Sequence, residues 1–477
     1  MRKKGSVTVF LTLILSLLLS LICASIESVR MASARTQILN GMDIGLYSLF
    51  GQYDKELLTD YDLFALDGSR GGGQLDLAAV CDELEAYMNP VLKQNSQKLT
   101  LCQSGLTGYR LLTDQKGEAF YQQIVGYMQE TLGSQGIQLL LGRMSERQEK
   151  TAQADQSANQ AQSKGSIDRY DSEMNQASEK SQQAAEEAQV VPQAPPAKNP
   201  ITIMKRIMKR GVLELVLPGG NGLSTKEIEK GTLVSGRGLQ QGMEMPDGMT
   251  VENSYTSEVL FQQYLMEHLG SYAEPSSTGL AYQVEYIFGG KDSDEDNLKA
   301  VASKLLFIRE GVNFACLMAD NVKRSEAQAL ATAIASGFLV PPAAVIIEAA
   351  LILCWAFAES VLDVRELFAG GRIPLVKSSG DWQISLENLP DLMEGLDSMR
   401  RNDEKGMSYK DYLQVLVLTV SKEKKAMRAM DMIENTIREK GRKNFCMDSC
   451  IVALEAFADV KANKKKDFQV IRQYCYE

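Results

Sequence analysis

The chain has 477 residues, 44% of them hydrophobic, so it can build two or three domains with sizeable cores and is not disordered throughout. Its net charge of −10 argues against nucleic-acid binding, because phosphate contacts require clustered Lys and Arg. Eight cysteines are too few for a disulfide scaffold in a chain of this length.

The first 27 residues are typical of a membrane anchor. Basic residues lie between Met1 and Lys4, and the run from Ser6 to Ile26 carries no charge. As an α-helix this run is roughly 31 Å long, which matches the hydrocarbon thickness of a bilayer. The positive-inside rule keeps its start in the cytoplasm and places the remainder outside. We therefore expect a single-pass cell-membrane protein that contacts the lipid bilayer through residues 6–26.

A cleavable secretory signal is the alternative interpretation, because a basic start and an apolar stretch also fit that pattern and small residues occur at 23–25. The apolar run exceeds a signal peptide's apolar region of about 7–15 residues. Helix-compatible spacing also continues through Val29 and Ile38. These features favour a retained helix.

The leader, with its basic residues, Gly5, Ser6 and an immediate apolar helix, resembles that of type IV and tight-adherence (Flp-type) pilins. This resemblance implies cleavage by a prepilin peptidase between Gly5 and Ser6. Phe10 stands where such pilins usually carry a glutamate that pairs with a neighbouring subunit. The difference implies an accessory or capping role more than that of a bulk filament subunit.

Residues 28–148 predict a juxtamembrane α+β region. Helical spacing continues to about Tyr53, and glycines at 71–73 mark a turn. The pattern then predicts a helix over 76–90 that stops at Pro90, one or two strands over 98–113, and a helix over 118–148.

Residues 149–200 are rich in Ala, Gln, Ser and finally Pro, which predicts a flexible stalk between folded parts. Residues 201–250 begin with a basic amphipathic helix that runs into a short apolar strand, followed by a turn at 218–222. The small basic patches in 205–210 and 464–466 are expected to be solvated helix faces.

Residues 251–477 predict a mainly helical extracytoplasmic domain, so the fold class is mainly α with a small α+β part. The run from Ile334 to Ala358 is apolar enough to suggest a second membrane span, but Pro341, Pro342 and Glu348 interrupt it and favour a buried core helix. Helical patterns occur at 256–271, 296–321, 324–337, 343–369, 408–440 and 446–461.

No catalytic, cofactor or metal residue is assigned from the sequence. His268 is the only histidine and has no nucleophile motif beside it, so we expect a helix-end role. Residues 292–297 imitate the start of a calcium loop but lack the glycine and glutamate that such a loop needs, which favours a helix N-terminus. Cys446 and Cys450 would share one helix face, yet no histidine completes a zinc site.

Two further patterns could suggest a phosphate-binding loop or a pair of catalytic carboxylates. The glycines around 236–242 have the wrong spacing for a phosphate loop. Glu359, Asp363, Arg365 and Glu366 are expected to pair along one partly solvated helix, and carboxylate-based hydrolysis is the minor alternative.

Nearly the whole chain resembles an uncharacterised family of membrane-anchored proteins from Gram-positive anaerobes, found with tight-adherence pilus components. That resemblance implies a structural or accessory part in a pilus-like or secretion apparatus, with pilin-like or pilus assembly proteins as partners. The alternatives are an extracytoplasmic ligand-binding module and an envelope hydrolase. The segments that carry the resemblance are 5–15, 61–67, 285–301, 355–365 and 406–413.

Overall fold

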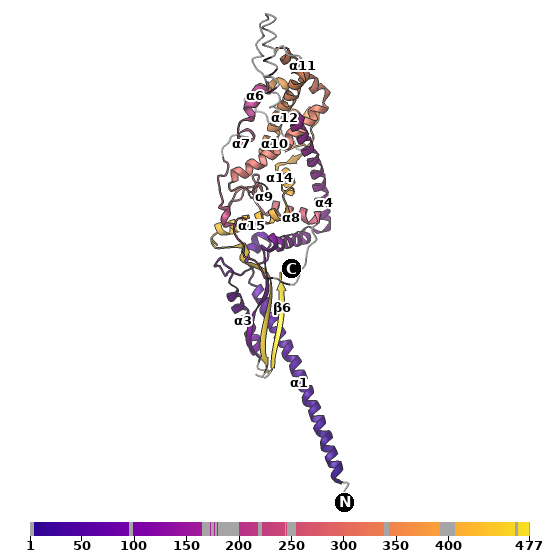
Figure 1. Ribbon diagram of the computed structural model, residues 1–477, viewed down its shortest axis with the longest axis vertical. Helices are drawn as coiled ribbons and strands as arrows, with labels where there is room; N and C mark the ends of the chain where they lie inside the picture. The colour runs from indigo at the N-terminus through magenta and orange to yellow at the C-terminus, as the bar shows by residue number, and fades with distance from the viewer. Residues whose placement is uncertain are drawn as a thin grey trace. The chain divides into compact units, whose positions relative to one another are not determined.

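A computed structural model describes residues 4–94, 99–164, 200–217, 222–243, 254–337, 343–391, 406–462 and 466–476, with the single positions 172, 176, 179 and 245. The protein is mainly α-helical with a small β part and begins with a long apolar helix (Figure 1), which confirms the predicted fold class. The chain divides into two compact units. The sheet unit comprises residues 1–127, 231–252 and 433–477, and the helical unit comprises 128–230 and 253–432.

Helix α1 (Lys4–Phe50) is one continuous helix with two different halves. In its second half Ile38, Met42, Leu46 and Leu49 are fully buried, at the spacing of a single helix face. This face packs into the core of the sheet unit. The helix predicted up to about Tyr53 is therefore confirmed, and it ends three residues earlier.

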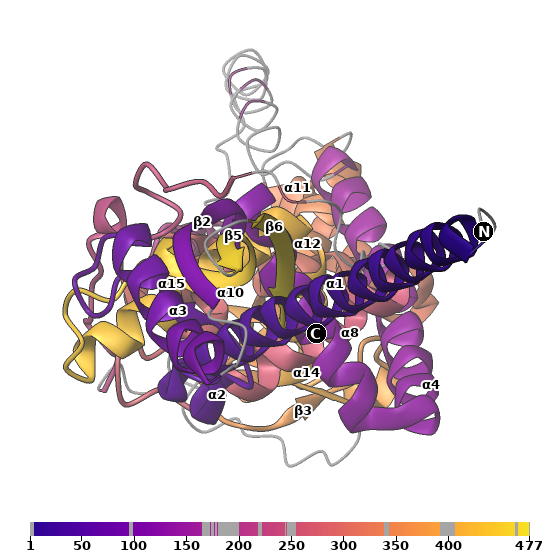
Figure 2. The same ribbon diagram turned by 90° about the horizontal axis from the view of Figure 1, so that it is seen from below.

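The sheet is antiparallel and is organised around β5 (Cys450–Ala462). Strand β2 (Leu99–Leu111) pairs along one side of β5, and β1 (Leu66–Asp67) and β6 (Lys466–Cys475) pair along the other. Figure 2 shows the three long strands side by side, with β5 between β2 and β6. Strands from the two ends of the chain thus form one sheet.

Helix α3 (Leu77–Lys93) completes the core of this unit together with α1. Every fourth residue of α3 from Val80 is buried, and alternate residues of β5 point into the same cluster. Helix α2 (Lys55–Tyr61) is short and begins at Asp54, whose carboxylate accepts the amides of Glu56 and Leu57.

The helical unit is built around α12 (Ala344–Phe368), whose side chains are almost all buried. Helices α10 (Asp294–Ala319) and α11 (Asn321–Gly337) pack against it. A short hairpin of β3 (Arg372–Ile373) and β4 (Met407–Ser408) lies in the same unit. The other helices are α6 (Pro200–Met208), α7 (Val212–Val216), α8 (Tyr255–His268), α9 (Gln283–Gly289), α14 (Tyr409–Leu418) and, across the boundary between the units, α4 (Asp114–Lys164) and α15 (Lys422–Glu439).

Two helices are long and apolar enough to cross a membrane, among the described residues. The most apolar part of α1 has no buried residue, whereas 78% of the corresponding part of α12 is buried inside the protein. This burial favours the core-helix interpretation of α12. Pro341 and Pro342, on which the prediction partly depended, lie outside the described residues.

The predicted helix over 446–461 is wrong, because these residues form β5. Ala and Leu have good helix propensity, but alternate residues from Leu454 to Ala462 are buried while Glu455 and Asp459 are only partly buried. Pairing with strands on both sides outweighs the local propensity. The residues from 433 onward therefore belong to the sheet unit, and the expected division at 251–477 is replaced by a discontinuous one.

Three other boundaries differ from the sequence analysis. Helix α3 continues beyond Pro90. This proline is exposed in the last turn of the helix, and Leu92 after it is buried in the core. The strand predicted after residue 211 is the short helix α7, and the helix predicted over 408–440 is divided into α14 and α15. Helix α4 extends to Lys164, so the first part of the predicted stalk is helical, and most of the rest lies outside the described residues.

Candidate functional site

The first half of α1 presents an apolar surface to its surroundings. From Val7 to Ile26 all the side chains are exposed, and Phe10 is 63% exposed. An uncovered apolar surface of this extent is typical of segments that contact lipid or another apolar surface. The structure thus provides an apolar N-terminal helix suited to be either a membrane anchor or a signal sequence.

Three hydroxyl groups in the apolar part of this helix donate to carbonyls of the helix itself. The hydroxyls of Thr12 and Ser16 donate to the carbonyls of Val9 and Leu13 at 2.9 Å, and Ser25 donates to Leu21 at 2.9 Å. In hydrocarbon no water is present to bond a hydroxyl, so an acceptor on the preceding helical turn removes that cost. The hydroxyl groups are therefore compatible with burial in a bilayer.

The predicted processing position lies at the start of this helix. Helix α1 begins at Lys4, so Gly5 and Ser6 fall in its first turn, where backbone amides have no partner within the helix. The exposure of side chains is described only from Val7 onward. Cleavage between Gly5 and Ser6 remains a prediction.

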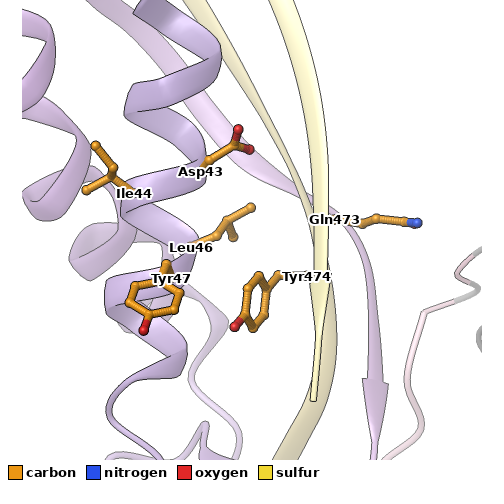
Figure 3. Close-up of a pocket in the computed structure, with 6 residues that line it drawn as sticks. All are labelled: Asp43, Ile44, Leu46, Tyr47, Gln473 and Tyr474. Atoms are coloured by element: carbon orange, nitrogen blue, oxygen red, sulfur yellow. The ribbon is translucent and has the colours of Figure 1, made fainter. Parts of the chain in front are cut away.

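Farther along α1, a shallow groove lies between this helix and strand β6 (Figure 3). Its volume is about 420 Å³, and the exposed residues Ile44 and Tyr47 form its apolar side. Tyr47 meets Tyr474 edge-on at 6.4 Å between ring centroids. Asp43, at one end, accepts a 3.0 Å bond from Arg472. The groove is mostly apolar and contains no unpaired charge among the described residues.

A group of possible metal ligands in the sheet unit is already neutralised by arginines. Glu434, Cys446 and Asp448 lie close enough to share an ion. Arg237 forms ion pairs with both carboxylates, at 2.6 Å to Asp448, and Arg438 pairs with Glu434 at 2.7 Å. Burial raises the pKa of the Cys446 thiol, which disfavours the thiolate that a metal needs. This cluster is better explained as a structural ion-pair network.

Cys446 and Cys450 do not share a helix face, because the predicted helix over 446–461 is wrong. Cys446 precedes a short 3₁₀ turn (η5, Met447–Ser449), and Cys450 is the first residue of β5. Both thiols are free. Burial raises the pKa of Cys450 well above its usual range.

Glu359 and Asp363 of α12 are buried and pair with other elements, which corrects the expected pairing along one partly solvated helix. Lys377 contacts Glu359 and Asp363, each at 2.5 Å. Arg309 of α10 also pairs with Asp363 at 2.8 Å. Arg365 donates instead to the carbonyl of Leu215.

This cluster is a closed network rather than a pair of catalytic acids. The amides of Gln383 and Ile384 donate to Glu359, and the neighbouring cations hold the pKa of Asp363 below its usual value. Hydrolysis by two carboxylates needs one protonated acid and one base within reach of a substrate. Two buried carboxylates bonded to buried cations do not offer that arrangement.

The buried carboxyl of Glu285 in α9 forms no ion pair in the described part of the chain. Its Oε1 accepts bonds from the Tyr409 hydroxyl at 2.6 Å and from the Tyr272 amide at 2.8 Å. Its Oε2 has no hydrogen-bond partner in the described part of the chain. Burial raises the pKa of Glu285 to about 7, against the lowering effect of these bonds. This group therefore titrates near neutral pH.

Two sequence predictions about polar motifs agree with the structure. His268 is the last residue of α8, where its ring stacks on Tyr264 and its Nδ1 lies 3.1 Å from that residue's carbonyl. Residues 292–297 form the start of α10, with Ser293 as its N-cap. Asp294 is buried and accepts the amides of Ala281 and Tyr282, so its carboxylate stabilises the local fold.

The partners of the buried charges and the groove beside Tyr47 were not predicted from the sequence. A signal for Arg309 existed, because this charge falls within the apolar face of α10 formed by Leu305 and Val312. A buried arginine requires an anion, although its identity depends on tertiary structure. The groove has no local signal, since it joins residues from opposite ends of the chain.

Comparison with known proteins identifies one family. A family model described as a family of unknown function (DUF5702) matches residues 192–462, which is more than half of the chain. No curated protein and no solved structure matches the chain.

Proposed function

We propose that this chain, which belongs to the DUF5702 family of unknown function, is a single-pass envelope protein that serves as a structural or accessory component of a pilus-like or secretion apparatus. In this proposal the N-terminus is cytoplasmic and the two folded units are extracytoplasmic. The proposal assigns no catalysis to the protein.

The continuity of α1 is the observation that carries the proposal. The same helix exposes its apolar first half and buries Ile38, Met42 and Leu46 in the core of the sheet unit. A simple tether would need only a flexible linker between membrane and domain. A continuous helix instead fixes the orientation of the sheet unit relative to the membrane segment, as a structural component requires.

The leader supplies the second line of support. Its resemblance to pilin leaders implies that Ser6 is the first mature residue and that Phe10 stands where pilins carry a glutamate. Because Phe10 is exposed and uncharged, it can pack against an apolar helix but cannot neutralise the new amine of a neighbouring subunit. We therefore propose a minor or capping position, or a membrane-resident accessory protein, with pilin-like or assembly proteins as partners.

Crosslinking in the native host tests this assignment. A photoreactive residue in place of Phe10 should join the full chain to a second membrane protein with a pilin-like leader. A photoreactive residue at Val322, which is exposed on α11, serves as the control. Crosslinks to lipid alone at Phe10 would reject a role in an assembly while leaving membrane anchoring intact.

Topology and processing are tested separately. A reporter that is active only outside the cytoplasm, fused after the last residue, should be active. A cytoplasmic signal would reject the single-span orientation. Amino-terminal sequencing of the native protein should find Ser6, whereas an intact start rules out the peptidase and a start near Ser25 restores the secretory-signal interpretation.

A further inference from the structure

We propose that the helical unit binds a small anionic ligand, one that carries a phosphate or carboxylate group, in a basic pocket between α4, the β3–β4 hairpin and α14. The pocket has a volume of about 450 Å³, within the usual range for small-molecule sites. This inference goes beyond the proposed function, which assigns no ligand. The pocket is lined by Arg143, Glu146, Arg147, Lys150, Arg372, Pro374, Leu375, Val376, Gly406, Met407 and Asp411.

The charge of the pocket is opposite to that of the chain. Four cationic side chains face two carboxylates, in a protein whose net charge is −10. One carboxylate, Glu146, pairs with Lys150 on the same exposed face of α4 at 2.5 Å. The other, Asp411, is shared by two arginines, so positive charge remains in excess.

Asp411 fixes the position of Arg147 and neutralises only part of the positive charge of the pocket. Arg147 donates to Asp411 at 2.7 Å and to the side chain of Gln414 at 3.1 Å. The other oxygen of Asp411 accepts the amide and hydroxyl of Ser408, both at 2.9 Å, as part of the cap of α14. A guanidinium fixed on two sides is preorganised to bind an anion with its remaining donors.

Two further arginines of the pocket have hydrogen-bond donors that remain available for a ligand. Arg372 lies 3.9 Å from Asp411 and donates a long 3.3 Å bond to the carbonyl of Gly406. Arg143 lines the pocket and has neither an ion pair nor a hydrogen bond in the described part of the chain. Arginine matches phosphate and carboxylate oxygens with two parallel donors, so this pair is suited to one such group.

The hairpin gives the pocket an apolar wall. Leu375 and Met407 are buried, while Val376 is 67% exposed and can contact the non-ionic part of a ligand. Gly406 has φ of +121°, and a β-carbon there would lie 2.4 Å from the carbonyl carbon of Ile373. The two strands therefore approach closely only because residue 406 is glycine.

Calorimetry on the full chain in an uncharged detergent tests the site with inorganic tripolyphosphate as the probe. We expect one binding event per chain that weakens as salt is added. The double variant Arg143→Gln with Arg372→Gln should weaken binding at least tenfold. The matched control, Arg206→Gln with Arg210→Gln, removes two charges outside the pocket and should bind like the parent.

Several outcomes would overturn the proposal: absence of binding at millimolar probe, equal weakening in both double variants, or no weakening in either. Val376→Asp provides a second test. The substitution adds a negative charge to the pocket at an exposed position, so it should weaken binding of the anionic probe without disturbing the core. Its thermal midpoint should match the parent.

The source of the anion is distinguished in vesicles. The full chain is placed in phosphatidylcholine vesicles with or without phosphatidylglycerol. Loss of tripolyphosphate binding when phosphatidylglycerol is present identifies a lipid headgroup as the ligand. Unchanged binding identifies a soluble anion.

Discussion

Gly45 of α1 lies directly against Met88 of α3: a β-carbon at position 45 would be only 2.6 Å from the Cγ of Met88 and 3.1 Å from a methyl carbon of Leu84. The absence of a side chain at this point lets the two helices approach closely. The second half of α1 is thereby packed tightly in the sheet unit, and the proposed function depends on this attachment.

Substituting Gly45 by Val should loosen this contact. Overpacking of a closely packed core costs about 1–3 kcal/mol, and the valine side chain must displace both Met88 and Leu84. Thermal or denaturant unfolding of the purified full chain would measure the loss. Gly126→Val in α4 is the matched control, because a β-carbon there meets no atom within 4 Å. Equal stability of the two variants would contradict the assigned contact.

The stability of the helical unit should depend on pH through Glu285. Its pKa is about 7 in the folded protein and 4.5 when unperturbed, so the folded state binds the proton more tightly. Stability from this group is fully present below about pH 4.5 and is lost as the pH rises towards 7. The shift corresponds to about 3 kcal/mol at pH 8.

Glu285→Gln should remove this dependence. The amide keeps the acceptor for Tyr409 and Tyr272 but carries no charge, so the variant should match the parent near pH 4 and exceed its stability at pH 8. Unfolding measured at both pH values, with the exposed Glu326→Gln as the control, tests this expectation. A parallel pH dependence in parent and variant would show that Glu285 is not the titrating group.

Removing Lys377 should destabilise the helical unit strongly. Lys377→Met leaves Glu359 buried without its cation, and breaking one partner of a buried pair costs about 3–5 kcal/mol. Adding Glu359→Gln to that variant should restore part of the loss, because the remaining uncompensated charge is removed. Unfolding of the two variants provides the comparison. If the double variant is no more stable than the single one, the pair does not act as a unit.

Divalent metal should not stabilise the sheet unit. Because Arg237 and Arg438 already neutralise Glu434 and Asp448, millimolar Zn²⁺ should leave the unfolding transition of the full chain unchanged. A chelator should have equally little effect. A stoichiometric rise in the thermal midpoint with Zn²⁺ would show that the arginines yield to a metal and would reassign the cluster.

Local signals in the sequence predicted the features that depend on neighbouring residues. The charge-free run after Gly5 predicted a long apolar helix, and residues 292–297 predicted a helix N-terminus capped by an Asp or a Ser, which is Ser293 in the structure. The core position of α12 followed from a glutamate within an apolar stretch. Each of these is decided by residues close together in the chain.

Features that depend on distant residues could not be predicted. Strand β5 has an alanine-rich sequence that favours helix locally, and only its pairing with β2 and β6 makes it a strand. The partners of Asp363 are likewise separated from it in sequence, as Arg309 shows. In the basic pocket, Arg147 pairs with Asp411, which lies far along the chain. The spacing of residues in the sequence does not indicate this contact.

The sheet unit can be completed only late in synthesis, because its central strand lies near the end of the sequence. Thr107 of β2 bonds to Glu455 of β5, 348 positions later, so the central strand leaves the ribosome about 20–70 s after its neighbour at typical translation rates. During that interval α1 has already emerged, and the face that includes Ile38 and Met42 still lacks the central strand that packs in its cluster. A truncation before residue 450 would leave this apolar face permanently without the central strand of its sheet, and the shortened chain should aggregate or be degraded.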